Sequence, residues 1–202
     1  MPTLREQFGE IDIYLFDQIL RGRILPGMRV VDAGCGSGRN LVYLLREGYD
    51  ICAADANPHA VEQVRRMARE LAPSLSDSNF RAEPVEDMSF QDAWADVVIS
   101  SAVLHFARDD AHFNAMLRGS WRVLRPGGLF FCRLASSIGI ENQIRSIGEG
   151  RYQLPDGSER YLVHQSLLDS LTQRMGVLVD PVKTTIVHNM RAMTTWVVRK
   201  NP

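Results

Sequence analysis

A glycine-rich stretch between two ordered segments constrains the fold of this 202-residue chain more than any other feature. The apolar residues Val30 and Val31 lead into Asp-Ala-Gly-Cys-Gly-Ser-Gly, and an amphipathic segment follows from Asn40. This order predicts a strand, a tight turn and a helix start, which is the first unit of an α/β sheet. Glycines lack the Cβ that would hold a ligand away from the backbone. The N–H groups and positive dipole end of the next helix favour a carboxylate or phosphate here.

The spacing of the glycines distinguishes between two kinds of ligand. Dinucleotide sites use Gly-x-Gly-x-x-Gly, whereas Gly34, Gly36 and Gly38 alternate here and Asp32 precedes them. Asp-x-Gly-x-Gly-x-Gly resembles the first motif of the class I S-adenosylmethionine-dependent methyltransferases. The resemblance implies that Asp32 pairs, directly or through water, with the ammonium of the ligand, while backbone N–H groups receive its carboxylate. A glycine-rich loop without a ligand is the alternative interpretation of this motif taken alone.

A second acid lies where nucleoside sites place one. Residues 49–54 are predicted to form a short buried strand that ends at Asp55. Asp55 lies roughly 20 residues beyond the glycine turn, where α/β sites place the acid that binds the ribose hydroxyls. Asn57 and Pro58 suit the cap and the first position of the next helix. The alternative for Asp55 is an ordinary loop acid.

A third element follows at the spacing that the family uses. Residues 79–82 are a short strand candidate, and Glu86, Asp87 and Met88 come after it. In the methyltransferase pattern, an acid here accepts a hydrogen bond from the adenine amine, and the next backbone N–H meets a ring nitrogen. The resemblance assigns this role to Asp87, with Glu86 as the alternate. A solvated acidic pair is the other interpretation.

The fourth predicted strand, within residues 95–106, has Ser100, Ser101 and Ala102 at its carboxyl end. Ligands of doubly wound sheets bind at such strand ends. A helix is predicted over residues 110–123, and the Leu-Arg-Pro-Gly-Gly turn after it also resembles the family. The motifs together span roughly residues 28–135. The predicted cofactor site consists of Asp32, Gly34, Cys35, Gly36, Gly38, Asn40, Asp55, Ala56, Asn57, Glu86, Asp87, Met88, Ser100 and Ser101.

Composition excludes several other classes of protein. The net charge is −1 and the isoelectric point about 6.5, so no basic surface for nucleic acid is expected. Cys35, Cys52 and Cys132 form no Cys-x-x-Cys pair and show no metal-ligand spacing, which favours a reducing compartment and no metal site. The sequence shows no signal-peptide pattern and no apolar run of the ~20 residues that span a membrane. We therefore expect a cytoplasmic protein, monomeric or homodimeric.

The whole chain is predicted to be one domain in three parts. In residues 1–27 an apolar stripe from Leu4 to Ile19 predicts one helix that could cover the open end of the site. Residues 28–135 form the cofactor-binding core. Residues 136–202 hold a long connection typical of lids or binding loops, a helix over 165–175, and two closing strands. The last segment weakly resembles methyltransferases of the tellurite-resistance type. The expected fold is a Rossmann-like, doubly wound, mostly parallel seven-stranded sheet with an antiparallel last strand.

The resemblance implies methyl transfer from S-adenosylmethionine to a small-molecule nucleophile, with S-adenosylhomocysteine as product. His105 follows the fourth strand and is the candidate general base, with a structural role as the alternative. Arg133 interrupts an apolar strand, so it needs either an anionic substrate or a buried acid, and we favour the acid. Tyr14, His105, Arg133 and Tyr152 are the candidate substrate-binding residues. Two other functions stay open: a non-catalytic domain that binds the same cofactor, and an NAD-dependent oxidoreductase, which Asp32 and the early third glycine disfavour.

Overall fold

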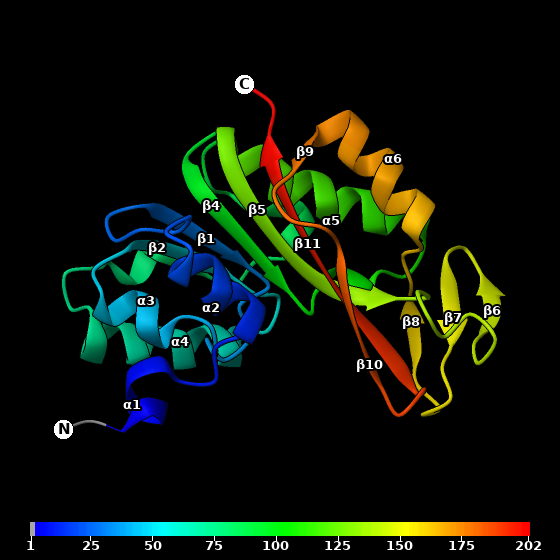
Figure 1. Cartoon of the computed structure of the whole chain (residues 1–202). Helices are drawn as coiled ribbons and strands as arrows, with labels where there is room; N and C mark the ends of the chain where they lie inside the picture. Colours follow the sequence, from blue (N-terminus) through cyan, green and yellow to red (C-terminus); the bar gives the residue numbers. More distant parts are fainter. Residues whose placement is uncertain (1–2) are drawn as a thin grey trace.

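The computed structural model describes residues 3–202, and its main element is a twisted, mostly parallel sheet (Figure 1). The strand order is β10-β11-β5-β4-β1-β2-β3. Strands β3, β2, β1, β4 and β5 run parallel, and β11 runs antiparallel to β5. The strands of this core are β1 Arg29–Ala33, β2 Asp50–Ala54, β3 Phe80–Arg81, β4 Ala95–Ser101, β5 Leu124–Ser136 and β11 Arg191–Lys200. The predicted doubly wound sheet with an antiparallel last strand is confirmed.

The outer edge of the sheet is one strand position filled by two segments. β9 (Gly176–Leu178) pairs with one end of β11, and β10 (Lys183–Val187) pairs with the other end. Pro181 lies between them and has no N–H to donate to a ladder, so the edge is interrupted there. Counting the two segments as one position gives the seven predicted strands. β10 and β11 join through a tight turn at His188 and Asn189, both with positive φ.

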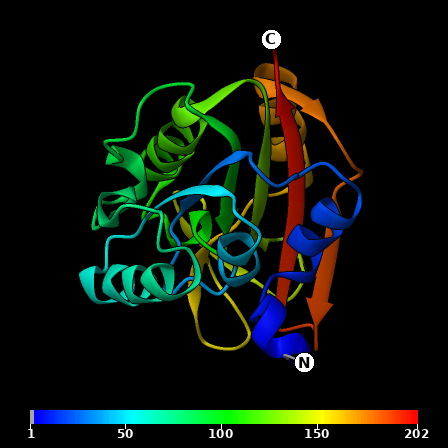
Figure 2. The same cartoon turned by 90° about the vertical axis from the view of Figure 1, so that its left-hand side faces the viewer.

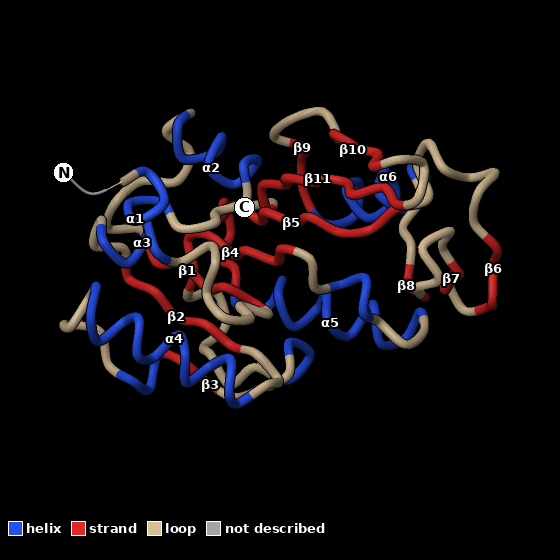
Figure 3. The backbone as a smooth tube through the Cα atoms, turned by 90° about the horizontal axis from the view of Figure 1, so that it is seen from below, coloured by secondary structure: helices blue, strands red, loops and turns tan. Residues whose placement is uncertain are grey.

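Alternating side chains bury the two faces of the sheet against different helices. Val31 and Ala33 face a core built with α5 (Asp110–Val123) and α6 (Gln165–Met175). Val30 faces the other core, which α2 (Ile13–Leu20), α3 (Val42–Arg46) and α4 (Pro58–Leu71) complete. Successive residues of a strand point to opposite faces, so both faces need cover. Figure 3 shows the resulting three layers, with helices on both sides of the strands.

The N-terminal segment forms two helices, so the predicted single helix is wrong. α1 (Leu4–Phe8) ends at Gly9, whose φ is +63°, and α2 begins after Asp12. The Asp12 side chain accepts the Tyr14 N–H at 3.0 Å and caps α2. The apolar stripe continues across this break because both helices pack on the same side of the sheet; Phe8, for example, stacks on Tyr43 of α3. Figure 2 shows α2 alongside β10 and β11.

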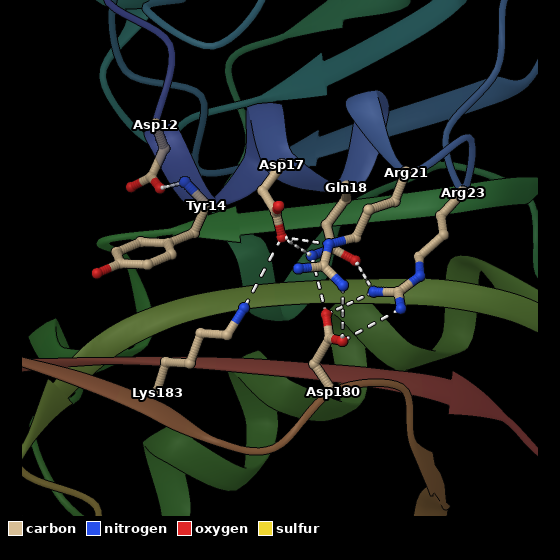
Figure 4. A network of polar contacts seen from close by, with 8 residues as sticks. All are labelled: Asp12, Tyr14, Asp17, Gln18, Arg21, Arg23, Asp180 and Lys183. Atoms are coloured by element: carbon tan, nitrogen blue, oxygen red, sulfur yellow. Dashed lines mark hydrogen bonds and ion pairs between the residues drawn. The ribbon is translucent and has the colours of Figure 1, made fainter.

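A network of polar contacts fastens α2 and the turn after it to the interrupted edge strand (Figure 4). Asp180, in the gap between β9 and β10, accepts two hydrogen bonds from the Arg23 guanidinium and one from Gln18. Lys183 of β10 lies 3.8 Å from Asp17, and the Tyr14 hydroxyl lies 2.7 Å from Thr185 Oγ1. The contacts of Asp17, Gln18 and Arg23 fasten the end of α2 and the turn after it, and the Tyr14–Thr185 contact fastens its start.

The segment from residue 136 to 165, of which residues 136–157 are predicted to be a lid or binding loop, contains a small antiparallel sheet of its own. Its strands are β6 (Arg145–Gly148), β7 (Arg151–Gln153) and β8 (Glu159–Tyr161). This sheet lies beyond the carboxyl end of β5, at one end of the molecule (Figure 1). A bridge between Ser136 and Val163 joins the insert to β5. Among the helices of residues 3–202, none is long and apolar enough to span a membrane.

Candidate functional site

The glycine turn lies between β1 and α3 and is stabilised by its own N–H groups. Gly34 and Cys35 donate to the Ala54 carbonyl at 2.8 and 3.0 Å, and Gly38 donates to the Cys35 carbonyl. Gly36 donates to Asp55 Oδ2 at 2.8 Å. Four N–H groups that the sequence offered to a ligand carboxylate are thus already used. The helix also begins at residue 42, not 40, because residues 38–41 form a further turn. A ligand carboxylate would therefore need donors other than these four N–H groups.

Two of the three glycines are required for different physical reasons. A Cβ on Gly34 would lie 2.5 Å from a methyl carbon of Val103, so no larger residue fits beside the loop after β4. A Cβ on Gly36 would meet nothing within 4 Å and would project into open space. Both residues have positive φ, which disfavours any residue with a side chain. Gly34 therefore allows close packing within the protein, while Gly36 leaves space that a ligand can fill.

Asp55 connects the glycine turn to the end of β2. Its Oδ2 accepts the Gly36 N–H, and its Oδ1 accepts the Asn57 N–H at 2.9 Å. These two bonds fix the carboxylate orientation and leave further lone pairs on each oxygen. The half-buried carboxylate lines the cavity beside the turn, so it can still accept hydrogen bonds from a diol. Asn57 caps α4 and Pro58 is its first residue, as predicted.

Asp32 is a buried carboxylate without a partner. The residue is 1% exposed, and neither oxygen makes a hydrogen bond within the described part of the chain. Burial raises the pKa of Asp32 to about 7; the charge of Asp55 adds to this rise and that of Arg39 opposes it. A buried carboxylate is normally paired, because its desolvation is costly. The arrangement therefore fits a bound cation next to the glycine turn.

A cavity of about 400 Å³ opens beside the turn, at the carboxyl ends of β1, β2 and β4. Six predicted cofactor residues line it: Gly34, Cys35, Gly36, Asn40, Asp55 and Ser101. Five further residues line it. Sequence reasoning missed Ser37, Arg39, Val103 and Phe106, whereas it placed Ala102 at the strand end where ligands bind. Arg39 donates to Ser101 Oγ at 2.9 Å, and Ala102 has a φ of +65°, which is unusual for a residue with a side chain. The sequence offered a signal for two of the four missed residues: Arg39 directly follows the glycine motif, and Phe106 is an aromatic residue directly after His105.

The other predicted cofactor residues do not line this cavity, and the buried Asp32 is one of them. Gly38 packs toward Val64 of α4, and Ser100 is fully buried inside the sheet. Ala56, Asn57 and Asp87 are solvent-exposed, and Met88 is buried in the core. Glu86 forms a 3.0 Å hydrogen bond with His112 and faces a different cavity, between α5 and α6. The structure therefore brings together the glycine turn, Asp55 and the end of β4, while the 86–88 segment stands apart from the lined cavity.

A second cavity of about 360 Å³ adjoins the first and shares Arg39, Ala102 and Phe106 with it. His105 and Arg133, both predicted from the sequence, line this second cavity. The turn between β7 and β8 contributes Leu154, Asp156 and Ser158, β8 contributes Arg160, and β11 contributes Arg191 and Met193. Tyr152 lines a different cavity, near Tyr161 and Asp110. Tyr14 contacts Arg133 face-on, with the guanidinium carbon 5.5 Å from the ring centre.

The geometry of His105 argues against its predicted role as a general base. Its Nδ1 accepts the Ala135 N–H at 3.2 Å, so the proton of the neutral ring resides on Nε2. Burial lowers the pKa of His105 to about 4, and the positive charge of Arg160 adds to this effect. The ring is therefore neutral near pH 7 and offers a hydrogen-bond donor, not a proton acceptor, to the second cavity.

Arg133 is paired with a buried acid, as favoured from the sequence. Its Nη1 lies 3.1 Å from Asp12 Oδ2, and Asp12 is 5% exposed. The Asp12 N–H donates to Asn40 Oδ1 at 3.0 Å, which gives Asn40 a structural role beside its place in the first cavity. Within residues 3–202, no group of three or more histidine, cysteine or acidic side chains could hold a metal ion.

Comparison with known proteins agrees with this geometry. The family model described as "Methyltransferase domain" matches residues 31–132, half of the chain. The ubiquinone biosynthesis O-methyltransferase of Chelativorans sp. (strain BNC1) is 28% identical over 170 residues, which cover 77% of this chain and 64% of that protein. The enzyme of the same name from Methylocella silvestris is 36% identical over 109 residues, 54% of this chain and 40% of that protein. The chain thus spans 40% to 64% of the length of these two relatives.

A solved structure shows the same fold over nearly the whole chain. The Burkholderia thailandensis 1,6-didemethyltoxoflavin-N1-methyltransferase superposes with a TM-score of 0.70 at 21% identity, covering 96% of this chain and 80% of that one. The matched family region contains the glycine turn, Asp55 and the end of β4, and these residues line the first cavity. Taken together, the match and the geometry show that the chain belongs to the methyltransferase domain family.

Proposed function

We propose that this chain transfers a methyl group from S-adenosylmethionine to a small-molecule nucleophile. The observation that carries the proposal is the unpaired Asp32 carboxylate, 1% exposed and next to the glycine turn. A ligand with an ammonium group would supply the missing cation. Asp55 would accept hydrogen bonds from the ribose hydroxyls, and Gly36 would let the ligand approach the backbone. Arg39, which lines both cavities, would bind the carboxylate in place of the N–H groups used within the turn.

Similar proteins support the cofactor and the size of the acceptor. The Burkholderia methyltransferase was crystallised with bound S-adenosylhomocysteine and 1,6-didemethyltoxoflavin. Ubiquinone biosynthesis O-methyltransferases are likewise named for a small-molecule pathway. A cavity of about 360 Å³ next to the first one has the volume of a small-ligand site. An acceptor placed there would meet the cofactor between Ala102 and Phe106.

The protein residues would act chiefly by positioning. When bound, S-adenosylmethionine supplies an electrophilic methyl group, and the acceptor's lone pair forms the new bond as the carbon–sulfur bond breaks. Holding the reacting atoms in line at close distance accounts for much of such catalysis. His105 would orient the acceptor by donating from Nε2, because its Nδ1 is occupied by Ala135. If the nucleophile carries a proton, that proton would pass to solvent or to a group close to the acceptor.

Calorimetric titration tests the proposal directly. S-adenosylmethionine, S-adenosylhomocysteine and NAD are titrated into the wild type and an Asp55→Ala variant. We expect micromolar binding of the first two ligands and at least about tenfold weaker binding in the variant, since hydrogen bonds to charged groups contribute about 1.5–3 kcal/mol. Binding of NAD alone would overturn the proposal in favour of a dinucleotide site. Binding of S-adenosylhomocysteine without methylation of any tested acceptor would point to a non-catalytic domain.

A further inference from the structure

The second cavity holds an unusual concentration of positive charge for a chain with a net charge of −1. Four arginines line it: Arg39, Arg133, Arg160 and Arg191. They come from the glycine turn, β5, β8 and β11, which are far apart in the sequence. Neither the composition nor any local charge run reveals this cluster, because the fold assembles it. Such a concave, one-signed surface focuses the electric field and attracts ions of opposite charge.

The carboxylates nearby compensate only half of this charge. Asp12 pairs with Arg133 at 3.1 Å and lies 3.7 Å from Arg39. Asp156 lies 3.3 Å from Arg191. No carboxylate of residues 3–202 lies within 4 Å of the Arg160 guanidinium, whose hydrogen bond goes to the carbonyl of its neighbour, Glu159. Four guanidinium groups face two carboxylates; since the proposed function assigns Arg39 to the cofactor carboxylate, Arg160 is the one left without a partner.

Arg160 is also held in a position to meet a ligand. Its guanidinium lies over the Phe106 ring, 5.0 Å from the ring centre, and Phe106 is 59% exposed at the junction of the two cavities. The positive charge of Arg160 affects the pKa of His105 and that of Asp156, so Arg160 lies near both residues. Arg191 flanks the same Asp156. Arg160, Arg191 and His105 all line this cavity, and Arg191 is paired with Asp156 there.

Almost all of the polar side-chain groups in this region are hydrogen-bond donors. Each arginine offers up to five N–H donors and no acceptor, and His105 offers one donor. Asp156 is the carboxylate in the lining, and Ser158 and Arg191 already occupy it. Leu154, Met193 and the Phe106 ring supply apolar surface between the donors. A complementary ligand has an apolar body and an oxyanion.

We propose that the methyl acceptor is a small organic anion whose oxyanion binds Arg160 and Arg191, with its nucleophile directed toward Ala102 and Phe106. This inference rests on the proposed function, since it names the substrate class of the same site. Arg133 is paired with Asp12 and Arg191 with Asp156, so Arg160 contributes most to anion binding. Carboxylate, sulfonate and phosphate groups share the chemistry required, and guanidinium forks match all three.

The test uses two probes of nearly equal shape and different charge, benzoate and benzamide. Each is titrated into the full chain saturated with S-adenosylhomocysteine, and inorganic phosphate is added as a third probe. We expect benzoate to bind at least tenfold more tightly than benzamide, with an affinity that falls as salt concentration rises. Phosphate binding without benzoate binding would assign the site to inorganic phosphate and overturn an organic acceptor.

Variants show whether Arg160 is responsible. Arg160→Gln should reduce the preference for benzoate to within about twofold, and Arg160→Lys should retain part of it. Arg66→Gln, an equal change of charge on the exposed face of α4, is the matched control and should leave the preference intact. Melting temperatures of all variants report whether each one folds, and Arg191→Gln provides a second test of the same region.

The proposal is overturned if benzamide binds as tightly as benzoate, if Arg160→Gln does not change the preference, or if no anionic probe binds at millimolar concentration. Titration of S-adenosylhomocysteine alone separates this result from a failure of the proposed function. Benzoate binding that depends on Arg160 in a protein that does not bind S-adenosylhomocysteine would leave an anion site but no methyl transfer.

Discussion

Asp12 and Arg133 form an ion pair across 121 positions of sequence, with Oδ2 and Nη1 3.1 Å apart. Asp12 begins α2, and Arg133 lies near the carboxyl end of β5. The same Asp12 caps α2 and donates its N–H to Asn40 of the glycine turn. One residue thus connects the N-terminal segment, the glycine turn and the wall of the second cavity.

Removing this carboxylate should destabilise the protein. Asp12→Ala leaves Arg133 partly buried without its counter-charge, a kind of change that typically costs about 3–5 kcal/mol. We expect the melting temperature to fall by roughly 6–20 °C. Glu10→Gln is the control in the same segment, because the Glu10–Arg5 pair is exposed and such pairs contribute little. Equal melting temperatures for Asp12→Ala and the wild type would contradict the structural role of the pair.

Binding of S-adenosylhomocysteine should depend on pH through Asp32. The pKa of this carboxyl is about 7 without ligand, and a bound ammonium favours its charged form. Protonation therefore competes with binding, and affinity should fall roughly tenfold between about pH 7 and about pH 5.5. Binding near pH 6.5 should release a proton, which titrations in buffers of different ionisation enthalpy detect. Asp32→Asn should bind more weakly and lose most of this pH dependence.

The same variant should stabilise the ligand-free protein at alkaline pH. The folded-state pKa of Asp32 lies above its ordinary value of 3.8, so the folded state holds the proton longer than the unfolded state. The free energy of unfolding of the wild type therefore falls as pH rises from about 4 to 7. Asp32→Asn removes this loss, on the order of 2–4 kcal/mol. Thermal melts should show the variant more stable at pH 8 and the difference nearly gone at pH 4.5.

His105 should lower the free energy of unfolding of the protein at acidic pH. Its pKa is about 4 in the folded protein, below the ordinary value of 6.5, so the unfolded state takes up the proton first as pH falls. The free energy of unfolding should decrease between pH 6.5 and pH 4, by about 3 kcal/mol at most. Asn at this position can keep an acceptor for the Ala135 N–H but cannot be protonated there. His105→Asn should therefore lose less stability than the wild type between pH 7 and pH 4.5.

Two alanine substitutions in the glycine turn should have different effects. Gly34→Ala places a Cβ 2.5 Å from a Val103 methyl carbon, so we expect a large loss of stability or misfolding. Gly36→Ala meets no protein atom within 4 Å and costs mainly the left-handed backbone, about 1–2 kcal/mol. It should fold yet bind S-adenosylhomocysteine more weakly. Similar melting temperatures for the two variants would show that Val103 can move away from the turn.

Local sequence signals predicted the regular elements well. The limits of α5 and α6 match the predicted ranges of residues 110–123 and 165–175. Asn57 and Pro58 begin α4 because a capping side chain and a fixed φ act within one turn of helix. The break between α1 and α2 was missed because the apolar stripe continues past it. Gly9 and Asp12 were the local signs of that break.

The candidate site could be predicted only where one short segment builds it. The glycine turn and Asp55 follow from motif spacing, and both line the first cavity. The second cavity depends on β5, the β7–β8 turn and β11 coming together, which no local pattern encodes. From the sequence alone, Arg160 and Arg191 would therefore be interpreted as ordinary surface charges. The sequence also could not show that the N–H groups of the turn already have hydrogen-bond partners. Their acceptors, the Ala54 carbonyl and the Asp55 carboxylate, lie at the end of a neighbouring strand.

The small sheet of β6, β7 and β8 has its own hydrogen-bond ladder, separate from that of the parallel strands. Its β7–β8 turn and β8 nevertheless supply Leu154, Asp156, Ser158 and Arg160 to the second cavity. Residues 145–161 thus supply part of the second cavity, while the glycine turn, the segment after β4, β5 and β11 supply the rest. Under the proposed function, recombination or mutation of residues 145–161 would allow new acceptors while the glycine turn and Asp55 stay unchanged. The insert is accordingly the region to randomise in a directed-evolution library.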